Sequence, residues 1–330
     1  MLIIKGLKKR FENLQVLSKI DLKVGKGEVV SVVGKSGSGK TTLLRLIAGL
    51  DIPDSGQIVL NDKVVNDKNT FIVPEKRDCS LVFQDYALFP NMTMKENIVF
   101  GRDSKEDPDH VGRLIDAAEI SNVMNKYPHE CSGGEQQRVA VVRSMATKPS
   151  ILLMDEPLSN IDQDLKTRLR GVIEGLLRDF DMSCLIVTHD TEDAIRMSDQ
   201  VIVINDNKIV QKGEPLDVLM NPVSKKVALL FGETNFIPLR LLPDAKKYFH
   251  DEISQKDYLS IRPNEFRLIE KGSTISEKVF SGKITSIKKT APGTEVELEC
   301  DNITITASLS SRLDLDVGKT INVELIKDPY

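Results

Sequence analysis

Short apolar runs alternate with segments of helical spacing from residue 29 to residue 211. Four short apolar runs predict buried strands, at residues 29–33, 79–83, 151–154 and 184–187. Apolar stripes predict helices that begin near residue 42, run through 103–130 and span 162–180. Residues 201–204 and 208–211 predict a hairpin. Strands that alternate with helices indicate an α/β domain with a buried parallel sheet.

The pattern changes near residue 236, after which helical spacing is rare and short strands recur. These strands are predicted at residues 259–261, 283–287, 295–299, 303–306 and 321–325. Turn residues separate them, which is typical of a small β-barrel or sandwich. We therefore predict two domains, 1–235 and 236–330.

The composition bears on the partners, the cysteines and the membrane association of the protein. The 330 residues include 45 basic and 49 acidic residues that are interspersed, so we predict no nucleic-acid partner. The four cysteines lack metal-binding spacing and are expected to pack as reduced thiols. No run approaches the roughly 18 apolar residues of a membrane span, and the N-terminus is the reverse of a signal peptide. If the protein serves a membrane, we expect it to do so from the water side.

A glycine-rich loop joins the predicted strand 29–33 to the next helix. The loop and the first helical residues are Gly34, Lys35, Ser36, Gly37, Ser38, Gly39, Lys40, Thr41 and Thr42. Strand, loop and helix in this order are the context of a phosphate-binding P-loop. The glycines let backbone N–H groups approach an anion, and the helix N-terminus adds a positive dipole end. We predict that Lys40 reaches the β- and γ-phosphates of a nucleotide and that Thr41 binds Mg²⁺.

Two carboxylates follow the apolar strand at 151–154. Asp155 and Glu156 stand where the carboxyl end of a parallel strand points at a ligand. Asp155 is placed to hold Mg²⁺ together with Thr41, and Glu156 to orient and polarise an attacking water. His189 follows the next apolar strand, so we predict it at the same edge of the sheet.

Two further motifs are weaker in isolation. Gln84 lies where a predicted strand runs into a loop. Ser132 and Glu135 form a capping box at a helix start. Gly133 and Gly134 leave this helix start free of side chains, which suits an approaching phosphate.

Five motifs agree in order and spacing with the nucleotide-binding subunit of ABC transporters, and the chain resembles that family over residues 1 to about 232. They are the P-loop, Gln84, the signature Ser132–Gly134, the pair Asp155–Glu156 and His189. The resemblance implies an ABC-type P-loop NTPase fold with a helical subdomain at about residues 86–148. It further implies ATP hydrolysis with ATP and Mg²⁺ as cofactors.

The resemblance also implies individual roles. Phe11, otherwise a partly buried strand residue, would stack on adenine. Gln84 would bind Mg²⁺ and sense the attacking water, and His189 would hold the γ-phosphate and help Glu156. Asp162 would lie in the loop 159–162 that links two sites.

The signature Ser132–Gly134 would face the γ-phosphate held by an opposite subunit. The chain departs from the family pattern at Cys131, Glu135 and residues 160–161. Glu135 places a charge near a phosphate site, although its side chain can also turn away and cap the helix. The departures leave the predicted catalytic set of Glu156, His189, Gln84 and Lys40 intact.

The β-rich tail resembles the regulatory barrel of bacterial importer ATPases that serve sugars, polyamines, sulfate and ferric iron. Its length and the segment Gly232–Phe236 favour the ferric-iron type. The implied partners are a second copy in a head-to-tail homodimer, integral-membrane permease subunits and, indirectly, a substrate-binding protein. The implied location is peripheral, on the cytoplasmic side of the inner (plasma) membrane. Residues 86–94 would dock the permease, or cover the core as a hydrophobic loop.

Two other classes of P-loop protein share some of these motifs. A soluble ABC-type ATPase of DNA repair would carry a long coiled-coil insertion, and one of translation would carry two cassettes. A P-loop GTPase or small-molecule kinase would leave the signature and His189 unexplained, and no N-K-x-D guanine-reading motif occurs. Both classes therefore explain the sequence less well than a transport ATPase.

Overall fold

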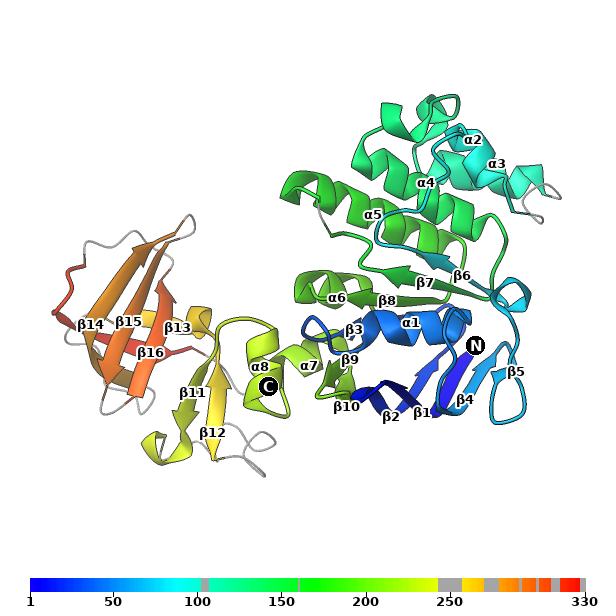
Figure 1. Cartoon of the computed structure of the whole chain (residues 1–330). Coiled ribbons are helices and arrows are strands. Elements are labelled where there is room, and N and C mark those ends of the chain that lie inside the picture. Colours follow the sequence, from blue (N-terminus) through cyan, green and yellow to red (C-terminus); the bar gives the residue numbers. More distant parts are fainter. Residues whose placement is uncertain are drawn as a thin grey trace. The chain divides into compact units, whose positions relative to one another are not determined.

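The computed structural model describes residues 1–101, 107–159, 161–242, 257–269, 279–290, 293–300, 303–309 and 315–326. The chain divides into two compact units, Met1–Val218 and Leu219–Tyr330, which are described separately (Figure 1).

The predicted boundary after residue 235 falls inside the second unit. The guanidinium of Arg262 donates hydrogen bonds to the carbonyl oxygens of Leu219, Ala228 and Gly232. These bonds join the helical segment before residue 235 to the strands after it. The boundary between the two compact units therefore lies at residue 218, before the change in sequence pattern near residue 236.

Six strands form the main sheet of the first unit, in the order β10-β9-β3-β8-β7-β6. They are β3 (Val29–Val33), β6 (Cys79–Val82), β7 (Ile151–Asp155), β8 (Cys184–Thr188), β9 (Gln200–Asn205) and β10 (Lys208–Gly213). The strands from β9 to β6 run parallel, and β10 pairs antiparallel with β9. The four predicted buried strands and the predicted hairpin are confirmed.

A second, antiparallel sheet has the order β2-β1-β4-β5. Its strands are β1 (Leu2–Phe11), β2 (Leu14–Val24), β4 (Ser55–Leu60) and β5 (Lys63–Asn66). The turn between β4 and β5 uses Asn61 and Asp62, both with positive φ, as expected for a tight hairpin.

Alternate residues of β7 enter two separate cores. Leu152 and Met154 pack with α4 (Gly133–Met145) and α5 (Gln163–Asp179). Ile151 and Leu153 pack with α1 (Lys40–Ala48). Side chains alternate between the two faces of a strand, so α1 and the pair α4 and α5 cover opposite faces of the main sheet (Figure 1). The helix predicted at 162–180 is confirmed as α5.

The helix expected through residues 103–130 is shorter in the structure. Residues 102–106 lie outside the described part, and α3 covers Pro108–Ala117. Glu119, just after the C-cap Ala118, has a φ of 54° in the left-handed region, and this conformation ends the helix. The remaining elements of this unit are α2 (Met94–Ile98), α6 (Thr191–Met197) and the 3₁₀ turns η1 (Pro74–Lys76), η3 (Ser121–Val123) and η4 (Pro128–Glu130). No helix in the described part of the chain is long and apolar enough to cross a bilayer.

The second unit is mainly antiparallel β structure. Helix α7 (Pro215–Met220) leads into it, and α8 (Lys225–Leu230) precedes a two-stranded sheet of β11 (Asn235–Pro238) and β12 (Tyr258–Ile261). A five-stranded sheet follows with the order β13-β17-β14-β15-β16, and its end strands β13 and β16 lie close together. Its strands are β13 (Phe266–Ile269), β14 (Val279–Lys289), β15 (Thr294–Cys300), β16 (Ile303–Leu309) and β17 (Thr320–Leu325), and its 3₁₀ turns are η5 (Leu239–Leu241) and η6 (Pro263–Glu265). The predicted barrel-like β domain is confirmed.

Candidate functional site

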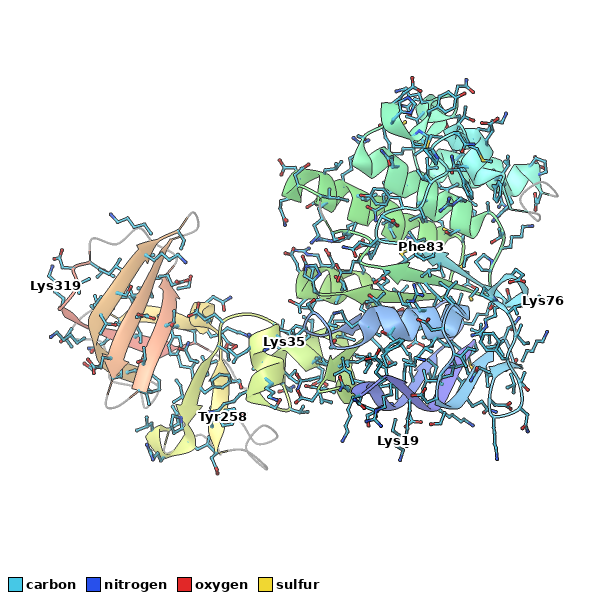
Figure 2. The ribbon with its side chains drawn as sticks, viewed as in Figure 1. Lys19, Lys35, Lys76, Phe83, Tyr258 and Lys319 are labelled. Atoms are coloured by element: carbon cyan, nitrogen blue, oxygen red, sulfur yellow. The ribbon has the colours of Figure 1, made fainter. Side chains whose placement is uncertain are left out.

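The loop between β3 and α1 forms a tight backbone cradle. Gly39 caps α1 with a φ of 95°, and a Cβ there would lie 2.6 Å from the carbonyl oxygen of Val16. A Cβ on Gly34 would overlap the carbonyl oxygen of Ile204. Glycine is required at both positions because the chain passes close to neighbouring backbone. Lys35, Ser36 and Gly37 of this loop are exposed, and Figure 2 labels Lys35.

Lys40 lies buried at the start of α1 and folds back across the loop. Its ammonium donates to the carbonyl oxygens of Gly34 at 2.9 Å and Lys35 at 3.1 Å. Burial lowers the pKa of Lys40, while the negative charges of Glu156 and Asp155 act to raise it. Among the described residues no carboxylate forms an ion pair with this ammonium, so the cation in the cradle can bind an anionic phosphate.

Thr41 connects the loop to β7. Its hydroxyl donates to Oδ1 of Asp155 at 3.1 Å, and Asp155 is only 9% exposed. Burial raises the pKa of Asp155, although the hydrogen bond from Thr41 opposes this. Mg²⁺ prefers oxygen ligands and is usually bound by one or two protein groups plus substrate phosphates. These two oxygens therefore fit a magnesium ion held together with a nucleotide. Thr42 follows, half-buried in the first turn of α1.

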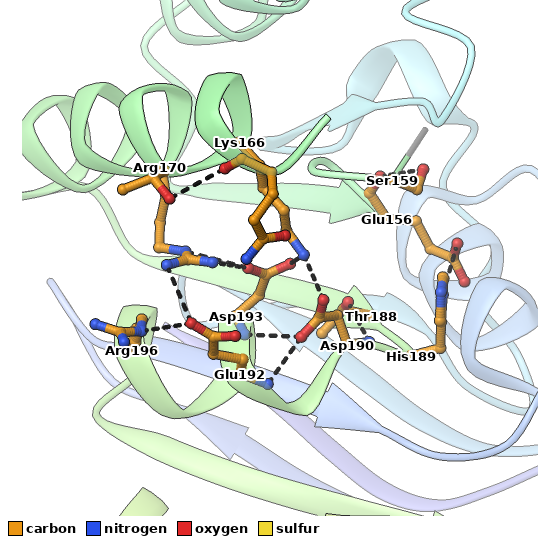
Figure 3. Close-up of polar contacts among 12 residues, drawn as sticks. Glu156, Ser159, Lys166, Arg170, Thr188, His189, Asp190, Glu192, Asp193 and Arg196 are labelled. Carbon is orange, nitrogen blue, oxygen red and sulfur yellow. Dashed lines mark hydrogen bonds and ion pairs between the residues drawn. The ribbon is translucent and has the colours of Figure 1, made fainter. Parts of the chain in front are cut away.

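Glu156 and His189 are in direct contact at the ends of β7 and β8 (Figure 3). Oε2 of Glu156 lies 3.0 Å from Nδ1 of His189, and the two side chains are 19% and 60% exposed. The backbone N–H of Glu156 donates to the carbonyl oxygen of Val187, while its φ of 49° turns the chain sharply out of the strand. Strained backbone of this kind is concentrated at functional sites, where it aims a side chain.

Three of the predicted catalytic residues, Gln84, Glu156 and His189, line one cavity of about 240 Å³. Gln84 belongs to the loop after β6 and is distant in sequence from Glu156 and His189. The cavity is also lined by Ser159, whose hydroxyl donates to the carbonyl oxygen of Glu156 at 2.9 Å.

Charged side chains of α5 and α6, which were not among the residues predicted from the sequence, also line this cavity. Lys166 of α5 is 8% exposed and binds Asp190, and it also binds Asp193 at 2.9 Å (Figure 3). Burial alone would lower the pKa of Lys166, but its hydrogen bonds to these two carboxylates raise it overall. Arg170, one turn further along α5, binds Asp193 at 2.7 Å. The spacing of these charges, four residues apart on α5 and three on α6, was the available signal.

Asp190 carries this network to the residue beside it, His189. Oδ1 of Asp190 accepts from the N–H groups of Glu192 and Asp193 and so caps α6. Its own N–H donates to the hydroxyl of Thr188. The backbone on both sides of His189 is therefore held by hydrogen bonds.

Ser132–Gly134 start α4 away from this cavity. The predicted capping box is present: Ser132 donates through its N–H and its hydroxyl to Oε2 of Glu135, at 2.8 and 2.9 Å. Glu135 thus turns back to cap the helix, and hydrogen bonds from Ser132 lower its pKa. Ser132 and Gly133 are exposed, and in the described part of the chain no hydrogen bond joins them to residues 34–41. The structure does not bring the signature and the P-loop together.

Two predicted site residues lie apart from the cavity. Phe11 ends β1 with its ring 44% exposed, and Nζ of Lys9 lies 4.7 Å from the ring centre. Asp162 is the N-cap of α5 and accepts from the N–H of Leu165 at 3.0 Å. Asn160, one of the departures from the family pattern, lies outside the described residues.

Comparisons with known proteins give consistent matches. A sequence profile for the family described as ABC transporter matches residues 17–159. The Fe(3+) ions import ATP-binding protein FbpC of Photorhabdus laumondii is 33% identical over 98% of this chain and 94% of that protein. The spermidine/putrescine import ATP-binding protein PotA of Vibrio cholerae is 33% identical over 96% of this chain and 89% of that protein. The sulfate/thiosulfate import ATP-binding protein CysA 2 of Chromobacterium violaceum is 43% identical, but the match covers 72% of this chain and 65% of the relative.

Solved structures agree with these relatives. The dimeric bacterial ABC transporter cassette MJ0796 is 27% identical, with a TM-score of 0.57 over 65% of this chain and 99% of the cassette. The protein cbiO1 of Clostridium perfringens has the same fold, with 24% identity and a TM-score of 0.60 over 66% of this chain and 89% of that one. The first unit thus has the P-loop nucleotide-binding fold of ABC ATPases, and an antiparallel β unit follows it. The chain therefore belongs to the ABC transporter family, as an ATP-binding, ATP-hydrolysing subunit of the import type.

Proposed function

We propose that this chain hydrolyses ATP as a head-to-tail homodimer that drives a separate permease. The observation that carries the proposal is the cavity that Gln84, Glu156 and His189 line together. Glu156 directly follows Asp155, which accepts the hydrogen bond from Thr41 of the P-loop helix. Phosphoryl transfer to water needs charge neutralisation and an aligned nucleophile but little covalent chemistry, and these groups supply both.

The P-loop binds the nucleotide in this proposal. The backbone N–H groups of residues 34–39 cradle the phosphates, with Thr42 in the first helical turn behind them. Lys40 turns from the carbonyl oxygens of its own loop to the β- and γ-phosphates. The exposed ring of Phe11 stacks on adenine. Thr41, Asp155 and Gln84 hold Mg²⁺, which supplies charge neutralisation at the phosphate oxygens when bound.

Glu156 and His189 act on the attacking water. A carboxylate oxygen of Glu156 accepts a hydrogen bond from the water and takes its proton as the oxygen bonds to the γ-phosphorus and the bond to ADP breaks. His189, at 3.0 Å from Glu156, orients this carboxylate and contacts the γ-phosphate. Gln84, which lines the same cavity, also fixes the water.

One copy of the chain offers only part of the phosphate site. The P-loop leads into α1 and the signature opens α4, and these helices cover opposite faces of one sheet. A second copy can present Ser132–Gly134 to the γ-phosphate, and Asp162 and its loop then lie between the two sites. The dimeric cassette among the similar structures supports this arrangement. Closing and opening of the dimer would move the permease.

The cargo and the remaining partners are proposals of the same kind. A ferric-iron importer subunit matches over 98% of this chain, and together with the segment Gly232–Phe236 this leads us to favour ferric iron over polyamines, sulfate or sugars. The permease would dock near residues 86–94, with a substrate-binding protein on its far side and this chain on the cytoplasmic side of the inner membrane. Residues 236–330 would regulate or dimerise the subunit. No observation favours a soluble ATPase outside transport.

The test is hydrolysis and transport by the purified parts. We expect ATP turnover that EDTA abolishes and excess Mg²⁺ restores. In proteoliposomes with the cognate permease, binding protein loaded with Fe³⁺ should stimulate turnover, while spermidine and sulfate should not. Absence of Mg²⁺-dependent hydrolysis would refute the enzymatic proposal, and stimulation by another cargo would refute only the choice of iron.

Lys166→Met is expected to impair hydrolysis more than Arg170→Met does. Each change breaks a buried ion pair between α5 and α6, so each should lower the free energy of unfolding by about 3 kcal/mol. Only Lys166 binds Asp190, the neighbour of His189. The kcat should therefore fall about tenfold further in Lys166→Met. Denaturant titration and steady-state kinetics measure both effects, and equal kcat values would show that Lys166 acts only on stability.

A further inference from the structure

The loop after Gln84 holds two consecutive residues in the left-handed backbone region. Tyr86 has a φ of 63° and Ala87 a φ of 46°. Neither residue is glycine, and a Cβ in this region comes too close to the following carbonyl oxygen. Such a pair persists only where surrounding contacts hold it.

Arg143 of α4 supplies those contacts. One guanidinium nitrogen donates to the carbonyl oxygen of Ala87 at 2.8 Å and another to that of Tyr86 at 2.9 Å. The guanidinium is half-buried, and burial lowers its pKa. Within the described residues it has no carboxylate partner, so its charge is directed at these two carbonyl oxygens. Hydrogen bonds from a charged donor are strong enough to offset the backbone strain.

The loop also contacts the other end of α4. The hydroxyl of Tyr86 lies 3.7 Å from where a Cβ on Gly133 would stand. Residues 84–87 therefore contact the helix both near its first residue and at Arg143.

Residues of this loop line two hollows of the first unit. Gln84 lines the cavity of about 240 Å³ that holds Glu156 and His189. Ala87 and Arg143 line a second hollow, a groove of about 420 Å³ whose lining includes three aromatic residues, Phe83, Phe89 and Phe100. A group that enters the groove meets Arg143 and Ala87 directly.

We propose that Arg143 is a positioning residue that holds Gln84 at the catalytic cavity by fixing Tyr86 and Ala87 in the left-handed conformation. The inference rests on the proposed function, since it assigns Arg143 an effect on that hydrolysis.

The test removes the hydrogen bonds of Arg143 and then relieves the backbone strain at position 87 with glycine. Arg143→Met should lower kcat about tenfold with little change in the KM for ATP, because Gln84 is displaced while the P-loop is not. Ala87→Gly alone should leave kcat near wild type. In Arg143→Met with Ala87→Gly, kcat should recover to within about threefold of wild type, because glycine adopts positive φ without strain.

Arg138→Met is the matched control. Arg138 lies on the same helix and is also largely covered, but its partner is Glu119. We expect it to keep kcat. The proposal is overturned if Arg143→Met keeps kcat, if Ala87→Gly fails to restore it, or if Arg138→Met loses as much.

Amide hydrogen exchange separates this proposal from the proposed function. Exchange of residues 84–87 should speed up in Arg143→Met and not in Arg138→Met, whether or not the protein hydrolyses ATP. Unchanged exchange in Arg143→Met would show that Arg143 does not hold residues 84–87 in place. If wild-type protein does not hydrolyse ATP but exchange still speeds up in Arg143→Met, Arg143 holds the loop. The hydrolytic function, and with it any effect of Arg143 on hydrolysis, is then refuted.

Discussion

Replacing Glu156 by glutamine is expected to lower the kcat of ATP hydrolysis by about a thousandfold and to leave ATP binding intact. Glutamine has nearly the same shape and can keep the contact with Nδ1 of His189, but its amide cannot take a proton from water. The P-loop is untouched, so the nucleotide should bind and hold two copies together without release. Size-exclusion chromatography in ATP should show a persistent dimer that wild type loses as it turns over.

Glu192→Gln is the control for this change. Glu192 lies on α6, close to the same network, and binds Arg196 at 3.0 Å and Arg170 at 3.8 Å. Removing its charge should leave kcat within about twofold of wild type because these pairs are exposed on one side. Turnover of Glu156→Gln at the wild-type rate would remove Glu156 from the role of base.

Ser132→Arg is expected to abolish hydrolysis while the isolated monomer still binds ATP. The arginine would stand where α4 of one copy meets the γ-phosphate held by the other, so closure fails although each P-loop is complete. Thr93→Arg is the matched control, because Thr93 caps α2 through the same capping box with Glu96. Both changes cost a helix cap, of about 1 kcal/mol, but only the first should stop turnover.

Mixing two inactive variants tests the shared site more sharply. Lys40→Met should lose hydrolysis through its P-loop, and Ser132→Arg through its signature. A mixed dimer then keeps one complete site, formed by the P-loop of the Ser132→Arg copy and the signature of the Lys40→Met copy. Half of the dimers are mixed, so about a quarter of wild-type turnover should return. Normal hydrolysis by Ser132→Arg alone would mean that the shared-site arrangement is wrong.

The sequence predicted the framework of the site because that framework is local. A strand, a glycine loop and a helix start are read within residues 29–42, and Asp155 and Glu156 directly follow an apolar run. The parallel sheet then brings the ends of β7 and β8 together, as any parallel sheet does. Strand positions in both units were predictable for the same reason.

The supporting contacts were not predictable, because they join residues far apart in the chain. Lys166 and Asp190 are separated by 24 positions, and Arg143 and Tyr86 by 57. In the sequence, Lys166 looks like a charge on the solvated face of an amphipathic helix, whereas in the structure it is buried. The left-handed backbone at Tyr86 and Ala87 also has no sequence signal, since neither is a glycine or an asparagine.

Because β7 has a hydrophobic core on each of its faces, the apolar pattern of this strand does not determine its register. Ile151, Leu152, Leu153 and Met154 are all apolar, so a shift by one residue would still fill both cores with aliphatic side chains. The polar residues that follow do distinguish the registers. A shift would move Asp155 from Thr41 and break the bond between the N–H of Glu156 and the carbonyl oxygen of Val187. The same two acids that serve ATP hydrolysis therefore also align the strand while the protein folds.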